Sequence, residues 1–407
     1  MTDADRPNLF DADNHYWEPS DAFTRYRDPA YADRGVQLAM VDDRLRYVVH
    51  GELHPWIPGP GDVNPRPRPG ALFDYFAGRG TRNEVAASLT AENPAEHPEW
   101  FDRDARLKVM DAQGLDACWM FPSQGVCMEG PMQPDIDAAV SILRSFNRWL
   151  DDDWGFAYQN RIFSAPYMTL SDIDAAVAEL DWSLDRGARI VALRPGPVFT
   201  VDGLRSPADP AFDPFWARVA ESGVVVAVHG GFEDGHHEVE DAIARTWGYR
   251  SRRREGAVSS LAYYEPFVDA LIHDRRTHDF LAALITHGLF ERHPGARVAS
   301  IENGATWVPG LRRVLLRLHT QNPGMFRRHP IDQLDENVWI APFVEDDVAE
   351  LARHMPVERI LFGSDWPHAE GFAEPNQFLA CLTGFSAEEQ RKIIHGNAAA
   401  LTFATAR

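Results

Sequence analysis

Short apolar runs rich in valine, isoleucine and aromatic residues recur along the chain, and longer amphipathic stretches separate them. Runs of this length between turn residues are typical of buried strands, whereas apolar positions spaced three and four apart are typical of helices. Their alternation predicts β-α units around a parallel sheet. Eight runs are predicted as strands: residues 9–15, 117–123, 162–169, 188–196, 223–231, 296–303, 337–344 and 359–367.

The count of eight strands is that of a TIM-type (β/α)8 barrel, so we predict an α/β fold with that architecture. Helices are expected between the strands, several of them opened by an Asp or Ser cap and closed by a Gly. They are predicted at residues 103–113, 135–151, 171–185, 213–222, 278–292 and 386–403.

Residues 31–100 interrupt this alternation after the first strand. Two segments within them, 36–41 and 44–49, predict a hairpin, and residues 55–69 are dense in proline. Because the loops that follow barrel strands build the active-site face, we expect this insertion to overhang the pocket as a cap. The alternative is a surface element or an arm that joins two subunits.

Composition limits what else the chain can be. Its 407 residues, 44% of them hydrophobic, can bury a large core, so we predict a single barrel domain over residues 1–407. The formal net charge of −21 disfavours nucleic acid and anionic membranes as partners. Without a long apolar stretch or a signal-peptide pattern, the chain is expected to be cytoplasmic. The three cysteines follow no disulfide or zinc-site spacing.

Ionisable residues stand at the ends of several predicted strands. Asp13 and His15 are two positions apart at the end of the first strand, so their side chains point to the same face. His229, Glu302 and Asp365 end the fifth, sixth and eighth strands. Each of these, taken singly, is as readily a turn or capping residue. Because parallel barrel strands end at one rim, the five strand-end residues are expected to converge there, and a metal ion is the simplest reason to gather them.

Several motifs resemble those of the amidohydrolase-related proteins of the aminocarboxymuconate-semialdehyde decarboxylase type, within the amidohydrolase superfamily. The resemblance covers most of the chain and implies a metal-dependent barrel. The motifs are the strand 1 run at 11–15, A-V-H-G at 227–230, E-R-H-P at 291–294, L-F-G-S-D-W-P at 361–367 and G-N-A at 396–398.

The resemblance implies that His15, His229 and Asp365 are metal ligands. The chain departs from the family pattern at Asp13, where a metal-binding histidine is expected, and at Glu302, where an acid/base histidine is expected. Both changes enrich the site in oxygen ligands, and the second removes the side chain best suited to proton transfer near neutral pH.

Two enzyme functions fit this ligand set, and we favour the first. In the first, the five strand-end residues bind one or two iron ions, His287 or His368 completes the shell, and oxygen is activated to hydroxylate a bulky apolar acyl or carboxylate substrate. In the second, the ligands of one zinc or manganese ion are Asp13, His15, His229 and Asp365. Glu302 then acts as general base for hydrolysis or decarboxylation. Glu302 and Asp365 are the predicted catalytic residues. A barrel that only binds a ligand is the third alternative.

Four further features carry weaker predictions. His287 lies on an apolar helical stretch, where a histidine more often packs in the core than binds metal, and His368 is expected to be solvated in its loop. Arg194 ends the fourth strand and is predicted to clamp a carboxylate or phosphate of a small-molecule substrate, unless it pairs with a protein carboxylate. The basic run at residues 250–254 fits the anionic tail of an acyl thioester or a solvated loop. Analogy with the family predicts a homodimer.

Overall fold

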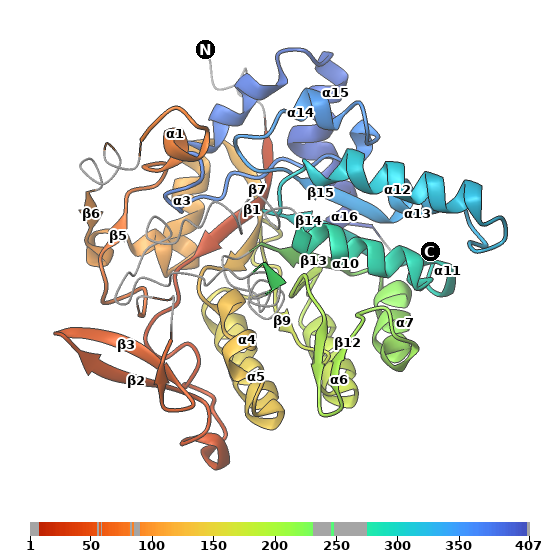
Figure 1. The fold of residues 1–407 in the computed structure, drawn as a ribbon. Helices are drawn as coiled ribbons and strands as arrows, with labels where there is room; N and C mark the ends of the chain where they lie inside the picture. The colour runs from red at the N-terminus through yellow and green to blue at the C-terminus, as the bar shows by residue number, and fades with distance from the viewer. Residues whose placement is uncertain are drawn as a thin grey trace.

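Parallel strands lie at the centre of the fold and helices surround them (Figure 1). The structure is a computed structural model that describes residues 8–54, 57, 59–81, 84, 90–230, 246–247 and 275–404. The basic run at residues 250–254 lies outside the described residues. The strands are β1 (Leu9–Tyr16), β2 (Val36–Val41), β3 (Arg44–Val49), β4 (Glu52–Leu53), β5 (Arg66–Pro67), β6 (Ala91–Glu92), β7 (Leu115–Pro122), β8 (Ile162–Ser164), β9 (Tyr167–Met168), β10 (Ile190–Leu193), β11 (Val198–Thr200), β12 (Gly203–Arg205), β13 (Val225–His229), β14 (Arg297–Ile301) and β15 (Val338–Ala341).

Two parallel sheets form this centre, which confirms the predicted α/β class. One has the order β1-β7-β8 and the other the order β15-β14-β13-β10-β9. β8 and β9 belong to one continuous stretch, in which the Ala165 N–H donates to Met120 O in β7, while the Ala192 N–H in β10 donates to Pro166 O, both at 2.9 Å. This stretch therefore joins the two sheets along one edge.

Residues 360–366 join the sheets along the other edge. The Leu361 N–H donates to Ile340 O in β15 at 2.8 Å, and the Ala12 N–H in β1 donates to Phe362 O at 2.8 Å. Bridges pair residues 340 with 360 and 14 with 366 in the parallel sense. The predicted eighth strand is thus a chain segment with only isolated bridges, and it lies between β15 and β1.

The helices follow the capping signals in the sequence. The helix at 103–113 begins after Asp102, whose side chain accepts from the Ala105 N–H, and ends at Gly114. The predicted helix at 278–292 is interrupted at Gly288, whose φ of 73° ends one helix and starts another. Of the described helices, none is long and apolar enough to cross a membrane. The helices are α1 (Phe73–Phe76), α3 (Arg103–Gln113), α4 (Glu129–Met132), α5 (Ile136–Asp153), α6 (Ile173–Leu184), α7 (Asp213–Ser222), α10 (Arg275–Thr286), α11 (Leu289–Arg292), α12 (Trp307–Gln321), α13 (Pro330–Asn337), α14 (Val348–Leu351), α15 (Ala387–Arg391) and α16 (Asn397–Thr402).

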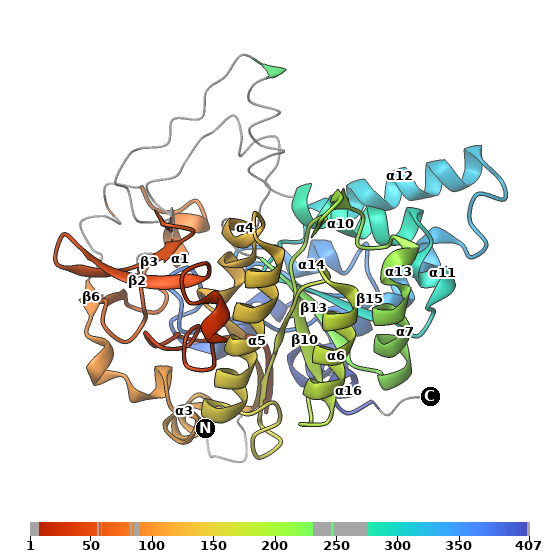
Figure 2. The same cartoon turned by 90° about the horizontal axis from the view of Figure 1, so that it is seen from below.

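The predicted hairpin at residues 36–49 is present as β2 and β3. Asp42 and Asp43 form its turn with φ of 49° and 60°, a conformation that aspartate tolerates better than most residues. The hairpin lies beside α4 and α5 in both views (Figures 1 and 2). Its Tyr47 hydroxyl donates to Gln124 Oε1 at 3.2 Å, in the loop that follows β7. The hairpin therefore packs against the ends of the central strands.

Glu18 connects the loop after β1 to the loop after β7 through hydrogen bonds. Its fully buried carboxylate accepts hydrogen bonds from the backbone N–H groups of Gln124 at 2.9 Å and Gly125 at 2.8 Å. Burial raises the pKa of Glu18 to about 7, although these N–H donors and the charge of Arg66 lower it in part. The protonated form of Glu18 is therefore favoured in the folded protein up to about pH 7.

Replacing Glu18 with glutamine should remove a pH dependence of stability. Because the pKa of Glu18 is higher in the folded protein than the ordinary 4.5, the stability due to its protonated form is complete below pH 4.5 and is lost as the pH rises through about 7. The unfolding free energy of E18Q, relative to wild type, should rise by roughly 3 kcal/mol over that interval. Urea unfolding at a series of pH values measures this.

The exposed Glu388 provides the matched control, because E388Q should keep the wild-type slope of stability with pH. A slope for E18Q that equals the wild-type slope would contradict the assignment to Glu18.

Candidate metal centre

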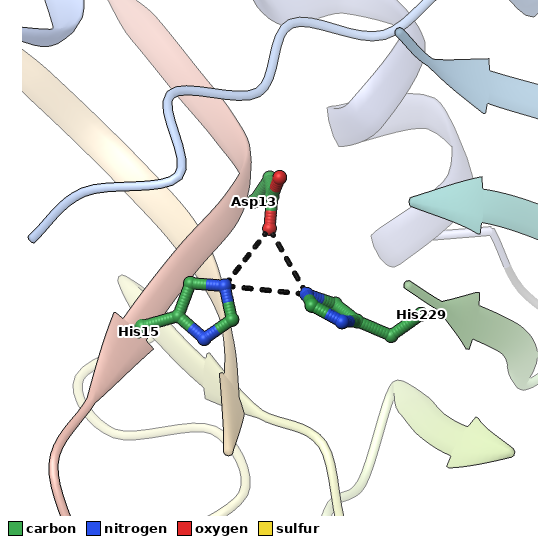
Figure 3. A group of neighbouring side chains, drawn as sticks. All are labelled: Asp13, His15 and His229. Atoms are coloured by element: carbon green, nitrogen blue, oxygen red, sulfur yellow. Dashed lines mark hydrogen bonds and ion pairs between the residues drawn. The ribbon is translucent and has the colours of Figure 1, made fainter. Parts of the chain in front are cut away.

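Three of the strand-end residues meet at one point (Figure 3). Asp13 and His15 project from the same face of β1, and His229 is the last residue of β13. Asp13 Oδ1 lies 3.3 Å from the Nε2 atoms of both histidines, and those two Nε2 atoms are 3.2 Å apart. All three side chains are buried. Ligand atoms about 2.1 Å from a tetrahedral metal lie about 3.4 Å from one another, so these separations suit a shared ion.

The hydrogen bonding of His229 supports a cation at this point. His229 Nδ1 contacts the carbonyl oxygen of Gly230, which can only accept, so Nδ1 carries the proton. His229 Nε2 is then the ring nitrogen that faces Asp13 and His15. A cation between these atoms, either a proton or a metal ion, prevents repulsion between their lone pairs. Imidazole nitrogens and a carboxylate oxygen are also a donor set that zinc, manganese and iron accept, so the residues fit a divalent metal.

Asp365 extends the cluster from the segment between β15 and β1. Its Oδ1 lies 3.4 Å from His15 Nε2 and 2.6 Å from His368 Nδ1. The expectation that His368 is solvated is therefore wrong, because the loop after residue 365 folds back over the site. The side chain of His368 is only 11% exposed.

Glu302 and Glu370 also lie close to Asp365. Ligand atoms of these three residues fall within 4.8 Å of one another, and Glu302 Oε2 is 3.7 Å from His229 Nδ1. Glu370 was not predicted as a site residue from the sequence. The only signal for it is its place five positions after Asp365, in a loop whose path cannot be inferred from local pattern.

Two glycines allow the strand ends to approach closely. A Cβ at Gly230 would lie 1.8 Å from the carbonyl oxygen of Glu302, and a Cβ at Gly363 would lie 2.7 Å from Cβ of Asp13. Glu302 and Asp365 themselves have φ of 51° and 56°, a left-handed conformation that is rare outside glycine. Such backbone strain is typical of functional sites.

Burial dominates the electrostatics of the cluster. It raises the pKa of Asp365 and of Glu302 well above the ordinary carboxyl value, and neighbouring carboxylates raise both further. Burial also lowers the pKa of His15 well below its usual value. For Asp13, burial raises the pKa, but hydrogen bonds from His15 and His229, together with the charges of these two histidines, outweigh burial and hold the pKa below the usual range. A bound cation would displace protons from this site and relieve the repulsion between its carboxylates.

Two residues predicted for the site lie elsewhere or are already paired. His287 is not in the cluster, because its exposed imidazole at the end of α10 contacts Ser206 Oγ at 2.7 Å. Its prediction as a ligand is corrected accordingly. Arg194 Nε lies 3.6 Å from Glu129 Oε2, and both side chains are buried. Its guanidinium thus already faces a protein carboxylate, the alternative that the sequence left open, and substrate clamping stays a prediction.

The amidohydrolase family model matches residues 10–402, so the chain belongs to the amidohydrolase family. This confirms the resemblance drawn from the motifs. Family membership, taken with the cluster of carboxylates and histidines, identifies a metal-dependent enzyme of the amidohydrolase superfamily. None of the curated proteins compared with the chain matches it.

Solved structures of similar fold include an amidohydrolase from Mycobacterium avium subsp. paratuberculosis, which is 40% identical with a TM-score of 0.90 over 98% of both chains. A dihydroxybenzoic acid decarboxylase from Polaromonas, with bound manganese and the inhibitor 2-nitroresorcinol, is 18% identical with a TM-score of 0.56 over 82% of this chain and 93% of that one. The 5-carboxyvanillate decarboxylase of Sphingomonas paucimobilis is 16% identical with a TM-score of 0.59 over 98% and 99%. The last two show likeness of fold alone.

Removing the imidazole of His229 should strongly weaken metal binding. Removing the imidazole of His287, which lies outside the cluster, should not. We expect H229A to lose more than about 100-fold in affinity for manganese, because even residues that only orient a ligand are worth about 10–100-fold. H287A should bind as wild type does. Elemental analysis after dialysis and calorimetric titration measure both variants, and equal loss of metal from the two would contradict the site.

Proposed function

We propose that this chain is a divalent-metal-dependent, non-oxidative decarboxylase of a small aromatic carboxylic acid. Manganese or zinc would be held by Asp13, His15, His229 and Asp365, and Glu302 would donate the proton. The observation that carries this proposal is the convergence of imidazole nitrogens and carboxylate oxygens from separate strand ends on one buried point, with Glu302 3.7 Å from His229. The substrate class is drawn from the decarboxylases that share the fold.

A divalent ion in this cluster would supply positive charge that binds and polarises the oxygen atoms of the substrate. This charge matters because the site is otherwise rich in carboxylates, which would repel an anionic substrate. Asp13 and Asp365 would balance the charge of the ion. Asp365 would be held in place by His368, and His229 by Gly230 O.

Glu302 is suited to hold the proton that the reaction consumes. Burial raises the pKa of Glu302, and the neighbouring carboxylates of Asp365 and Glu370 raise it further, so the protonated carboxyl is favoured. Glu302 would deliver this proton to the ring carbon that bears the carboxylate. The bond from that carbon to the carboxylate then breaks, its electron pair restores the aromatic ring, and carbon dioxide leaves. Solvent returns the proton to Glu302.

We also propose how the two sheets and the insertion are arranged. The hydrogen bonds at residues 165–166 and 360–366 support closure of the two sheets into a (β/α)8 barrel, as the family implies. We further propose one barrel domain over residues 1–407, with residues 31–100 as a cap. Its assembly as a homodimer, its cytoplasmic location and the acyl thioester as substrate stay predictions from the sequence.

Hydrolysis is the second candidate, because the 40% identical structure is named an amidohydrolase. Glu302 would then act as a general base toward water. The oxygen-dependent iron hydroxylase that the sequence favoured gains no support from these neighbours, whose names describe an amidohydrolase and decarboxylases and, in one case, bound manganese.

A substrate panel with a metal panel separates these functions. Protein loaded with manganese, zinc or iron would be incubated with carboxyl-labelled hydroxybenzoates in D2O. Decarboxylation predicts labelled carbon dioxide and one deuteron on the ring, without oxygen consumption. Cleavage of amides or lactones without release of carbon dioxide would favour the hydrolase, and iron-dependent oxygen uptake would favour the hydroxylase. Absence of bound metal in the purified protein would overturn all three.

Replacing Glu302 with glutamine should remove proton transfer while leaving the metal in place. We expect kcat of E302Q to fall by about 10²–10⁴-fold, the usual contribution of a positioned acid or base. Manganese content should stay at the wild-type level. E350Q, at an exposed position of α14, is the matched control and should retain wild-type kcat. Loss of manganese from E302Q would instead make Glu302 a ligand.

A further inference from the structure

His368 reaches the cluster from outside it and makes hydrogen bonds with both of its ring nitrogens. Nδ1 lies 2.6 Å from Asp365 Oδ1, and Nε2 lies 2.8 Å from Ser123 Oγ. The imidazole also lies against His15, with ring centroids 4.0 Å apart, and near Trp17 at 5.1 Å. Packing from these rings and hydrogen bonds at both nitrogens leave the side chain a single orientation.

The hydroxyl of Ser123 sets the direction of this hydrogen-bond chain. It donates to the carbonyl oxygen of Tyr16 at 2.6 Å, so its oxygen accepts from Nε2–H of His368. Nδ1 and the carboxyl group of Asp365 then share a proton, because two lone pairs at 2.6 Å would repel. Both nitrogens of His368 are therefore occupied by hydrogen bonds, one to Ser123 and one to Asp365.

We propose that His368 is a positioning residue that aims Asp365 at His15 and at the metal. A chain of hydrogen bonds runs from Tyr16 O at the end of β1 through Ser123 after β7 to His368, and His368 in turn contacts the carboxyl group of Asp365. This role rests on the proposed metal centre. It differs from a ligand role, because His368 acts through Asp365 and does not touch the ion.

Titration of each variant with manganese tests this role. H368F keeps the ring packing but loses both hydrogen bonds, and it should weaken manganese affinity by about 10–100-fold, the range found for residues that orient ligands. H368N places an amide donor where Nδ1 lies and should recover most of that loss. S123A removes only the anchor and should give a smaller loss than H368F. H354F, at a surface histidine that contacts Glu350, is the matched control and should bind as wild type does.

A count of bound nitrogens separates positioning from ligation. Pulsed electron paramagnetic resonance of the manganese-loaded protein should report the imidazoles of His15 and His229 both in wild type and in H368F. A third imidazole in wild type that disappears in H368F would make His368 a ligand and overturn the proposal.

Two other outcomes would also overturn it. One is H368F binding manganese as tightly as wild type, which leaves the metal centre standing and removes only the role of His368. The other is equal loss in H368F and H368N, since restoring the donor must restore affinity. If wild type binds no metal, the proposed function and this role fail together. Should H368F fail to fold, judged by circular dichroism, S123A decides, and wild-type affinity in S123A overturns the proposal.

Discussion

The buried carboxylate of Asp11 holds the first strand to the segment that precedes the last helices, and the site depends on that junction. Its oxygens accept from the Asp13 N–H at 3.1 Å and the Asn14 side chain at 2.9 Å on one side, and from the backbone and hydroxyl of Ser364 on the other. Burial raises its pKa to about 7, and these donors offset part of that cost. Asp13 is one of the residues that donate to Asp11, and Asp365 directly follows Ser364, which is another. The same hydrogen bonds therefore fix the distance between both candidate ligands.

Arg106 completes this junction from α3. Its guanidinium is fully buried and donates to the Asn14 side chain, to His15 O at 2.7 Å and to Glu99 O at 2.8 Å, and it lies 4.5 Å from the centre of a ring of Trp366. A buried charge is tolerated only when its donors are satisfied in this way. The backbone of β1 is therefore held on both sides at the residues that carry the site.

The cluster is an arrangement that a bound cation would complete. Imidazole nitrogens and carboxyl oxygens face one another in a buried region, and the backbone at Glu302 and Asp365 has a left-handed conformation that is rare outside glycine. Glycines at residues 230 and 363 provide the space. A bound divalent metal would relieve the repulsion between the carboxylates of the cluster, and this relief would contribute to its affinity.

The sequence by itself determined the local elements and the ligands that belong to them. Helices at 103–113 and 213–222 match their predicted bounds, because caps and apolar spacing act within a few residues, and the pairing of Asp13 with His15 follows from strand periodicity. Only the tertiary structure decided between the alternatives for His368, which contacts Asp365, brought Glu370 to the site, and showed that His287 contacts Ser206 and that Arg194 pairs with Glu129. These outcomes depend on the path of loops and on partners distant in sequence, and local pattern carries no information about either.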